Sequence, residues 1–70
     1  MSNGTVKWFN TKKGYGFIIP EEKSVEKDIF VHITRLEKTG IKKLLDGQHV
    51  SFDLYDDNGK PAAENVFIMN

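Results

Sequence analysis

The 70-residue sequence contains no cysteine, only two prolines and no long apolar run. Without cysteine the chain cannot form a disulfide framework or a zinc knuckle, and it offers no thiol nucleophile; small secreted domains usually depend on such cross-links. A membrane span needs roughly 20 consecutive apolar residues. Residues 1–4 also lack the charged and apolar regions of a signal peptide. We therefore expect a cytoplasmic protein that makes no contact with a membrane.

Net charge is also absent, because ten Lys and Arg residues balance ten Asp and Glu residues. A neutral chain is not held to its partner mainly by bulk electrostatics, which argues against a simple coating of duplex DNA. The charges are nevertheless segregated. Residues 1–20 contain three lysines and no acidic residue, whereas residues 46–57 contain four aspartates and neither Lys nor Arg. One face of the protein is therefore expected to be locally positive.

Short segments rich in Val, Ile, Phe, Trp and Tyr recur between clusters of Gly, Asn, Asp and Pro, a pattern typical of an all-β domain built from hairpins. A chain of this length can bury only one hydrophobic core, so residues 1–70 are expected to form a single, monomeric domain. The segment Thr34–Asp46 includes one turn of helical sequence but also Gly40, and a long loop is expected there. Five strands are predicted, at Thr5–Asn10, Tyr15–Pro20, Asp28–Ile33, His49–Asp56 and Ala63–Met69.

Two predicted turns join neighbouring strands into hairpins. Thr11–Gly14 ends in glycine, which tolerates a positive φ, and Asp57–Pro61 contains Asn-Gly, the dipeptide preferred in tight hairpins. Five strands are too few for a two-sheet sandwich, and closing a single sheet removes the edge strands that invite aggregation. We therefore predict a small five-stranded antiparallel β-barrel.

Side chains on a strand alternate between the two faces of the sheet. Val50, Phe52 and Leu54 share one face of their strand and are expected in the core. Ile29 and Val31 share one face of another strand and are expected there too.

The same alternation sends aromatic side chains outward. If Ile18 lies in the core, Tyr15 and Phe17 take the opposite face of their strand. Phe30 and His32 likewise oppose the inward residues of the next strand. Trp8 is an exception, because strict alternation puts it on the same face as Val6, so exposing the indole while Val6 stays buried requires a β-bulge.

Exposed aromatic rings on neighbouring strands lower the solubility of a protein unless a partner covers them. Unpaired bases stack on such rings at roughly 1–3 kcal/mol each, while lysines beside the rings meet the phosphates. Single-stranded nucleic acid uses both kinds of side chain. We therefore predict a surface that binds single-stranded RNA or DNA and catalyses nothing.

Five segments carry a resemblance to a known family: residues 4–10 (GTVKWFN), 13–18 (KGYGFI), 28–32 (DIFVH), 47–52 (GQHVSF) and 61–66 (PAAENV). In order and spacing the chain resembles the bacterial cold-shock proteins over essentially its whole length, including two ribonucleoprotein-type motifs on adjacent strands. The resemblance implies a five-stranded antiparallel barrel of the OB type. It also implies binding of single-stranded RNA and DNA, and ATP-independent RNA chaperone activity that destabilises weak RNA structure, with effects on transcription and translation.

The resemblance also assigns contact residues by position. Asn10 and Asp28 are expected to bond base edges, and His32 to stack or donate. The family's nucleic-acid contacts fall on Lys7, Trp8, Phe9, Asn10, Lys13, Tyr15, Phe17, Asp28, Phe30 and His32.

Three features depart from the family's pattern. The family usually carries a Phe after the histidine of the second motif and another aromatic later in the long loop, where this chain has Ile33 and Ile41. An isoleucine offers apolar contact but no π face, so we expect weaker binding or a smaller footprint, by less than the roughly 1–3 kcal/mol of each lost stack. The loop Glu21–Lys27 is also two or three residues longer than usual and lacks the common glycine.

Other functions fit the sequence less well. The aromatic residues can be ordinary core residues, but alternation argues against this. Residues 13–17 also open the RNP1 pattern of an RRM domain, yet only twelve residues precede them, too few for the strand and helix required. An enzyme would have to depend on His32 and His49, which have no nucleophile at a suitable spacing, and no His, Asp or Glu cluster has metal-ligand spacing, so no cofactor or metal is expected.

A protein-binding module is the strongest alternative, because an exposed aromatic patch on a neutral domain also suits a protein partner. Three cations, Lys7, Lys13 and Lys60, favour nucleic acid instead, and Lys60 is added to the predicted binding residues on that ground.

Overall fold

The computed structural model describes residues 1–22 and 27–69 of the chain. The predicted lengthening of the loop Glu21–Lys27 therefore lies largely outside the described residues. Within them, no helix is long and apolar enough to cross a membrane. The elements are, in chain order, β1 (Ser2–Asn10), β2 (Tyr15–Pro20), β3 (Ile29–His32), α1 (Ile33–Glu37), β4 (His49–Asp57) and β5 (Lys60–Ile68).

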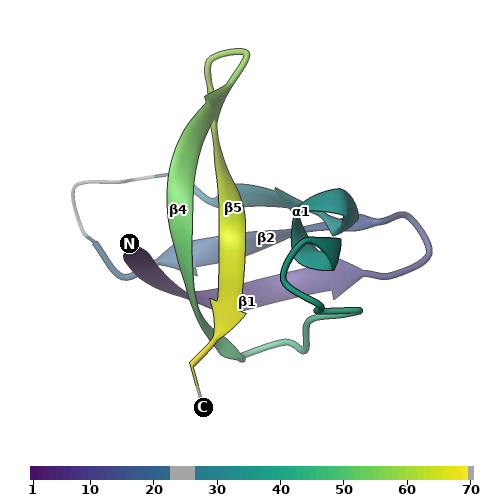
Figure 1. Cartoon of the computed structure of the whole chain (residues 1–70). Coiled ribbons are helices and arrows are strands. Elements are labelled where there is room, and N and C mark those ends of the chain that lie inside the picture. The colour runs from purple at the N-terminus through teal and green to yellow at the C-terminus, as the bar shows by residue number, and fades with distance from the viewer. Residues whose placement is uncertain (23–26, 70) are drawn as a thin grey trace.

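The five strands form a closed barrel in the order β1-β2-β3-β5-β4, which confirms the predicted all-β barrel (Figure 1). Four of the pairings are antiparallel. The fifth, which joins β3 to β5, is a short parallel contact between Phe30 and Ala62, so the description as antiparallel does not hold for this one pairing. That contact closes the barrel.

Both predicted hairpins are present, and their turns have the predicted backbone. The β1–β2 turn ends at Gly14, whose φ is 78° and whose N–H donates to the carbonyl of Asn10 over 2.8 Å. In the β4–β5 turn, Asn58 (φ 52°) and Gly59 (φ 86°) connect the paired residues Asp57 and Lys60. Positive φ at both central residues matches the right-handed twist of the strands, which is why Asn-Gly is favoured there.

The core forms where inward side chains of the barrel meet. It contains the residues predicted by alternation on β2, β3 and the first half of β4, together with Val6 and Val66. Among the described residues, the members of this buried cluster are Val6, Ile18, Ile29, Val31, Leu36, Leu44, Val50, Phe52, Ala63 and Val66.

Leu54 was predicted in the core and this prediction is wrong, because 39% of its surface is exposed. It keeps the inward parity of Val50 and Phe52, and it pairs across the sheet with Ala63. The reason is that β4 and β5 continue beyond the barrel and project from it as a hairpin (Figure 1). Alternation sets the direction of a side chain, but it does not supply neighbours to cover it.

The segment Thr34–Asp46 is not entirely a loop as predicted, because α1 occupies Ile33–Glu37 and β3 ends one residue early, at His32. His32 caps this helical turn: its Nδ1 accepts a hydrogen bond from the Thr34 N–H over 3.2 Å. Leu36 is fully buried and joins the core. A helix this short has too few residues for a helical periodicity, so its tertiary contacts decide whether it forms.

Two neighbouring isoleucines on β2 test the assignment of the inward face. Ile18 is fully buried, whereas 47% of the Ile19 surface is exposed. Ile18→Val should lower the free energy of unfolding by about 0.5–1.5 kcal/mol, through a lost methylene and the cavity it leaves. The same change at Ile19 should have less than about 0.5 kcal/mol of effect. Urea unfolding of both variants measures the difference, and equal losses would contradict the assigned faces.

Candidate functional site

Five side chains form a continuous patch of rings on the outer face of β1, β2 and β3, here called the aromatic platform: Trp8, Tyr15, Phe17, Phe30 and His32. Each is half-buried. Trp8 lies 5.3 Å from Phe17 between ring centroids, and Phe30 lies 5.9 Å from both Tyr15 and Phe17. His32 extends the patch at 6.3 Å from Phe30. The outward direction predicted for Tyr15, Phe17, Phe30 and His32 is confirmed.

The β-bulge that Trp8 requires is present on β1. Val6 pairs with Ile18 but Trp8 pairs with Phe17, so Lys7 is an extra residue on its strand. This insertion reverses the alternation, which leaves Val6 buried while Trp8 joins the outward rings of β2. The bulge therefore brings the indole to the platform.

The glycine between the two aromatic residues of β2 lets the strands approach closely. A Cβ on Gly16 would lie 2.3 Å from the carbonyl oxygen of Trp8 and 2.7 Å from the Cα of Phe9, which are both backbone atoms of β1. Since the backbone cannot move aside easily, position 16 requires the absence of a side chain. Gly16 thus keeps β1 against β2 at the point where their rings meet.

Phe9 is the one aromatic residue of the predicted site that lies apart from the platform. It pairs with Gly16, whose side of the sheet is inward, and it packs against the core as a half-buried residue. Phe9 was included among the predicted contact residues by its position in the family resemblance. Adjacent residues on a strand point to opposite faces, so the structure places Phe9 beneath the platform and not on it.

Lys7 and Asp28 form an ion pair at one edge of the platform, with 2.9 Å between Nζ and Oδ2. The two side chains are 50% and 39% exposed. Exposed ion pairs contribute roughly 0–1 kcal/mol to stability. The Lys7 ammonium can therefore exchange Asp28 for another anion at little cost.

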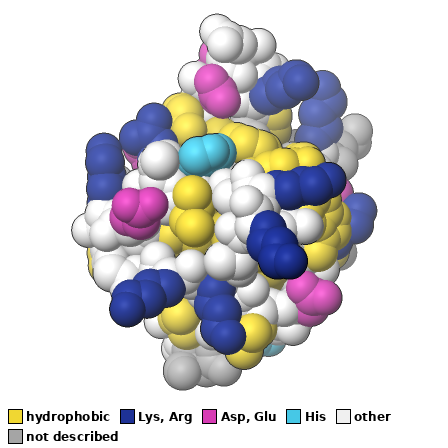
Figure 2. Space-filling model, turned by 90° about the vertical axis from the view of Figure 1, so that its right-hand side faces the viewer, with side chains coloured by type: hydrophobic (Ala, Val, Ile, Leu, Met, Phe, Trp, Pro, Cys, Tyr) yellow, Lys and Arg dark blue, Asp and Glu magenta, His cyan; other side chains and the backbone are white. Residues whose placement is uncertain are grey.

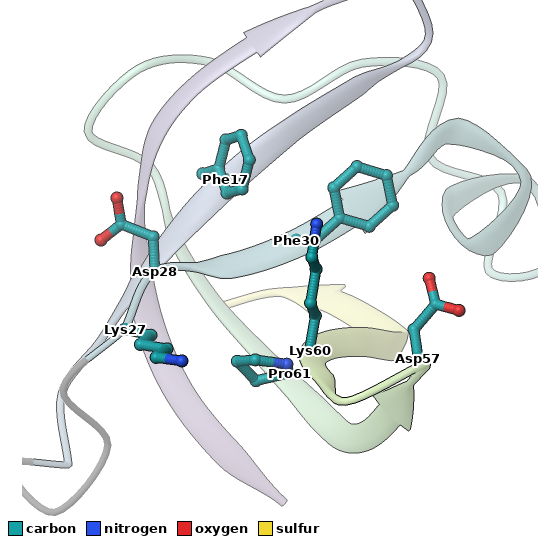
Figure 3. Close-up of a pocket in the computed structure, with 7 residues that line it drawn as sticks. All are labelled: Phe17, Lys27, Asp28, Phe30, Asp57, Lys60 and Pro61. Atoms are coloured by element: carbon teal, nitrogen blue, oxygen red, sulfur yellow. The ribbon is translucent and has the colours of Figure 1, made fainter.

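Two platform rings, Phe17 and Phe30, line an open hollow of about 460 Å³ (Figure 3). Lys60 and Pro61 reach it from the start of β5, far away in the sequence. The structure thus brings Lys60, one of the residues predicted to bind nucleic acid, to the same hollow as two platform rings. Sequence reasoning missed three further lining residues, Lys27, Asp57 and Pro61, although each is adjacent to a predicted site residue or turn.

Asn10 is the last residue of β1, where it pairs with Tyr15, and Lys13 lies in the turn that follows. The Oδ1 of Asn10 accepts a hydrogen bond from the Lys13 N–H over 2.9 Å, so this oxygen is used to shape the turn. The Nδ2 group of Asn10 is then the part suited to donate to a base. Lys13 is exposed, with its charge in solvent.

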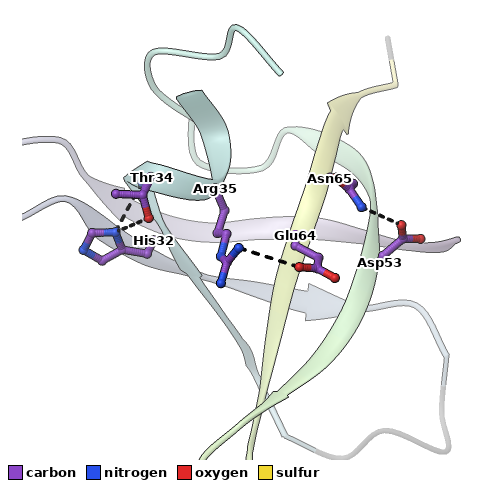
Figure 4. A network of polar contacts seen from close by, with 6 residues as sticks. All are labelled: His32, Thr34, Arg35, Asp53, Glu64 and Asn65. Atoms are coloured by element: carbon purple, nitrogen blue, oxygen red, sulfur yellow. Dashed lines mark hydrogen bonds and ion pairs between the residues drawn. The ribbon is translucent and has the colours of Figure 1, made fainter. Parts of the chain in front are cut away.

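Thr34 fixes the ring of His32 (Figure 4). The backbone N–H of Thr34 donates to Nδ1, and its Oγ1 lies 2.9 Å from the same nitrogen. His32 therefore has two roles, as the cap of α1 and as the end of the platform.

Two isoleucines, Ile33 and Ile41, occupy positions where the resemblance predicts aromatic residues, and their surroundings differ. Ile41 packs against the core, and Ile33 is half-buried at the start of α1, where its N–H donates to the carbonyl of Gly14. Neither supplies a ring to the platform.

Lysine and arginine side chains gather around apolar surface on one side of the molecule, as Figure 2 shows. Within residues 1–22 and 27–69, no group of three His, Cys, Asp or Glu side chains is placed to hold a metal ion. The side chains gathered at the site are aromatic rings, which can stack, and lysines, which can pair with anions.

Comparisons with known proteins agree with the family resemblance seen in the sequence. The family described as the 'Cold-shock' DNA-binding domain matches residues 2–69. The chain is 48% identical over 68 residues to a probable cold shock protein, y4cH, of Sinorhizobium fredii, covering 94% of this chain and 96% of that protein. It is 50% identical over 66 residues to the cold shock protein CspD of Bacillus subtilis, with 94% and 96% covered. It is also 50% identical over 66 residues to the cold shock-like protein CspC of Buchnera aphidicola, with 94% and 93% covered.

The strength of the Lys7–Asp28 ion pair can be measured directly as a coupling free energy. A double-mutant cycle with Lys7→Gln and Asp28→Asn should give a coupling free energy below about 1 kcal/mol, because both partners are exposed. The coupling should fall further in 0.5 M salt, through screening. Urea unfolding of the four proteins measures it. A coupling above about 2 kcal/mol would mean that the pair is a fixed structural link and not an exchangeable one.

Proposed function

Since the chain belongs to the cold-shock domain family, a family of nucleic-acid-binding proteins, we propose that it binds single-stranded RNA and DNA on the aromatic platform. Bases stack on the rings of β1, β2 and β3, while lysines at the edges pair with phosphates. The observation that carries this proposal is the set of outward, half-exposed rings in mutual contact on three adjacent strands.

A single strand suits the platform better than a duplex. Bases in a duplex are stacked on one another, so their faces are not available to protein rings, whereas an unpaired strand can turn each base toward the surface. The chain also has no net charge, which weakens the sequence-independent attraction that duplex binding needs. Stacking therefore supplies most of the binding energy, and the lysines add a smaller, salt-sensitive part.

Binding of this kind accounts for a chaperone activity on RNA. A protein that binds only the open form of a hairpin pulls the equilibrium toward that form by mass action, without ATP. Weak hairpins open first, because their opening costs least. In the cytoplasm such activity would act on transcripts during transcription and translation, with the protein acting as a monomer.

Removal of a platform ring should weaken binding. Phe30→Ala should raise the Kd for oligothymidine by about 5- to 150-fold, which corresponds to the roughly 1–3 kcal/mol of a lost stack. Phe67→Ala is the matched control, because Phe67 is a 48% exposed phenylalanine on β5 outside the platform. Titrations followed by Trp8 fluorescence, which should be quenched by single strands and little changed by duplex, provide the Kd. Equal affinities for Phe30→Ala and the parent protein would show that the bases bind elsewhere.

Salt should reveal the phosphate contacts. With about three such contacts, a plot of log Kobs against log salt concentration should have a slope near −2. Lys60→Gln should make the slope less steep by about 0.7, the value for one contact to a single strand. Lys43→Gln removes the same charge from the connection between α1 and β4, at the other end of β4, and should leave the slope unchanged. A slope near zero for the parent protein would instead indicate a hydrophobic contact of the kind that protein partners make.

A further inference from the structure

The outer face of the platform continues past Phe30 to the far side of the barrel. Phe17 is paired with Phe30, Phe30 with Ala62, and Ala62 with Tyr55. Directly paired residues on neighbouring strands project from the same face of a sheet. Tyr55 of β4 therefore points outward in the same row as the platform rings, two strands beyond Phe30.

Ala62 forms the link between Phe30 and Tyr55. It is fully buried but does not belong to the core cluster, so it is covered from the outer side of the barrel. Its side chain is a single methyl group, which is completely covered by its surroundings. Two strand spacings amount to about 10 Å. A strand of nucleic acid that leaves Phe30 can cross this distance in one or two nucleotides.

Arg35 of α1 lies over the outer face of β4 and β5. Its Cζ is 4.8 Å from the centroid of the Tyr55 ring, and its Nη1 is 3.7 Å from Oε1 of Glu64 (Figure 4). The Arg35 side chain is 33% exposed. A guanidinium is planar and stacks on bases as well as on aromatic rings, so Arg35 and Tyr55 together present the chemistry of a stacking position.

A second open hollow, of about 410 Å³, borders Tyr55 and is also lined by Leu54, Asp56, Gly59 and Pro61. Pro61 lines the first hollow as well, where Phe17, Phe30 and Lys60 lie. The two hollows are therefore neighbours on either side of Pro61. Open space therefore adjoins Pro61 both beside the platform rings and beside Tyr55.

We infer that Arg35 and Tyr55 form an additional stacking position for a base of the single strand bound on the platform. This inference rests on the proposed function and extends its footprint onto β4. Asp56 and Asp57 follow Tyr55 at the end of β4, so this end of the surface repels phosphate and favours the binding of a base. Lys60 pairs with Asp57 across the hairpin and is the cation that meets the phosphate between the two positions.

A purely structural role for the pair makes a different prediction. If Arg35 merely holds α1 against β4 and β5, replacing either residue affects folding stability and changes the affinity for ligands of every length equally. If a base stacks there, the effect depends on length. Only a strand long enough to pass Phe30 reaches Tyr55.

The experiment compares a short and a long oligothymidine, of about four and about nine nucleotides, within the range of site sizes of OB folds. Tyr55→Leu should leave the Kd for the short strand within about twofold and raise the Kd for the long strand at least about fivefold, the lower limit for a lost stack. Phe67→Leu is the matched control and should change neither. An equal effect of Tyr55→Leu on both lengths, or no effect on either, would overturn the inference.

Changes at Arg35 test the guanidinium itself. Arg35→Lys keeps the charge but not the plane, and should lose affinity for the long strand alone, whereas Lys43→Gln, which removes a charge elsewhere, should not. Photocrosslinking of the unaltered protein to a long strand containing bromodeoxyuridine should label Tyr55. A crosslinked complex without label on Tyr55 would contradict the additional stacking position. If Phe30→Ala left the Kd unchanged for both strand lengths, the platform assignment would be wrong. The length dependence of the Tyr55→Leu effect is measured separately, so the two failures can be told apart.

Discussion

The burial of Ile18, Ile29 and Val31 on the inner face of β2 and β3 is the constraint on which the rest of the structure depends. Each occupies the position next to a ring in the sequence, and alternation then leaves that ring outside. On these two strands, burying the aliphatic side chains in the core therefore also exposes the aromatic side chains to solvent. A protein that buried the rings instead would have to expose these aliphatic residues.

The third strand of the platform needs a further device, since β1 has the wrong parity for its tryptophan. The bulge at Lys7 supplies it, and Gly16 lets the bulged strand lie close to β2. The same bulge places Lys7 next to Asp28 at the edge of the rings. The bulge, the absent side chain of Gly16 and the charge of Lys7 therefore lie together in one part of the barrel.

The electrostatics of the surface follow from a neutral total charge that is unevenly spread. The hollow beside the platform rings has two lysines and two aspartates in its lining, Lys27, Lys60, Asp28 and Asp57, whereas the hollow beside Tyr55 is bordered by Asp56 and, among the described residues, by no lysine. In the binding mode proposed above, a ligand that is anionic along its backbone and aromatic in its bases is favoured over the rings, where the lysines lie. It is less favoured near the turn, where stacking has to compensate for repulsion. The affinity for such a ligand is therefore expected to differ between the platform and the region near the β4–β5 turn.

Local pattern alone determined most of this protein: the strands, the two hairpin turns, the inward aliphatic residues and the outward rings all follow from alternation and turn chemistry, which depend on neighbours in the chain. The bulge at Lys7 was also predictable, because Val6 and Trp8 cannot otherwise take opposite faces. Tertiary structure decided the remainder. The exposure of Leu54 and the capped turn after His32 depend on what lies opposite each residue. The meeting of Phe30, Ala62 and Tyr55 depends on barrel closure through β3 and β5, and no local pattern specifies which distant strands pair.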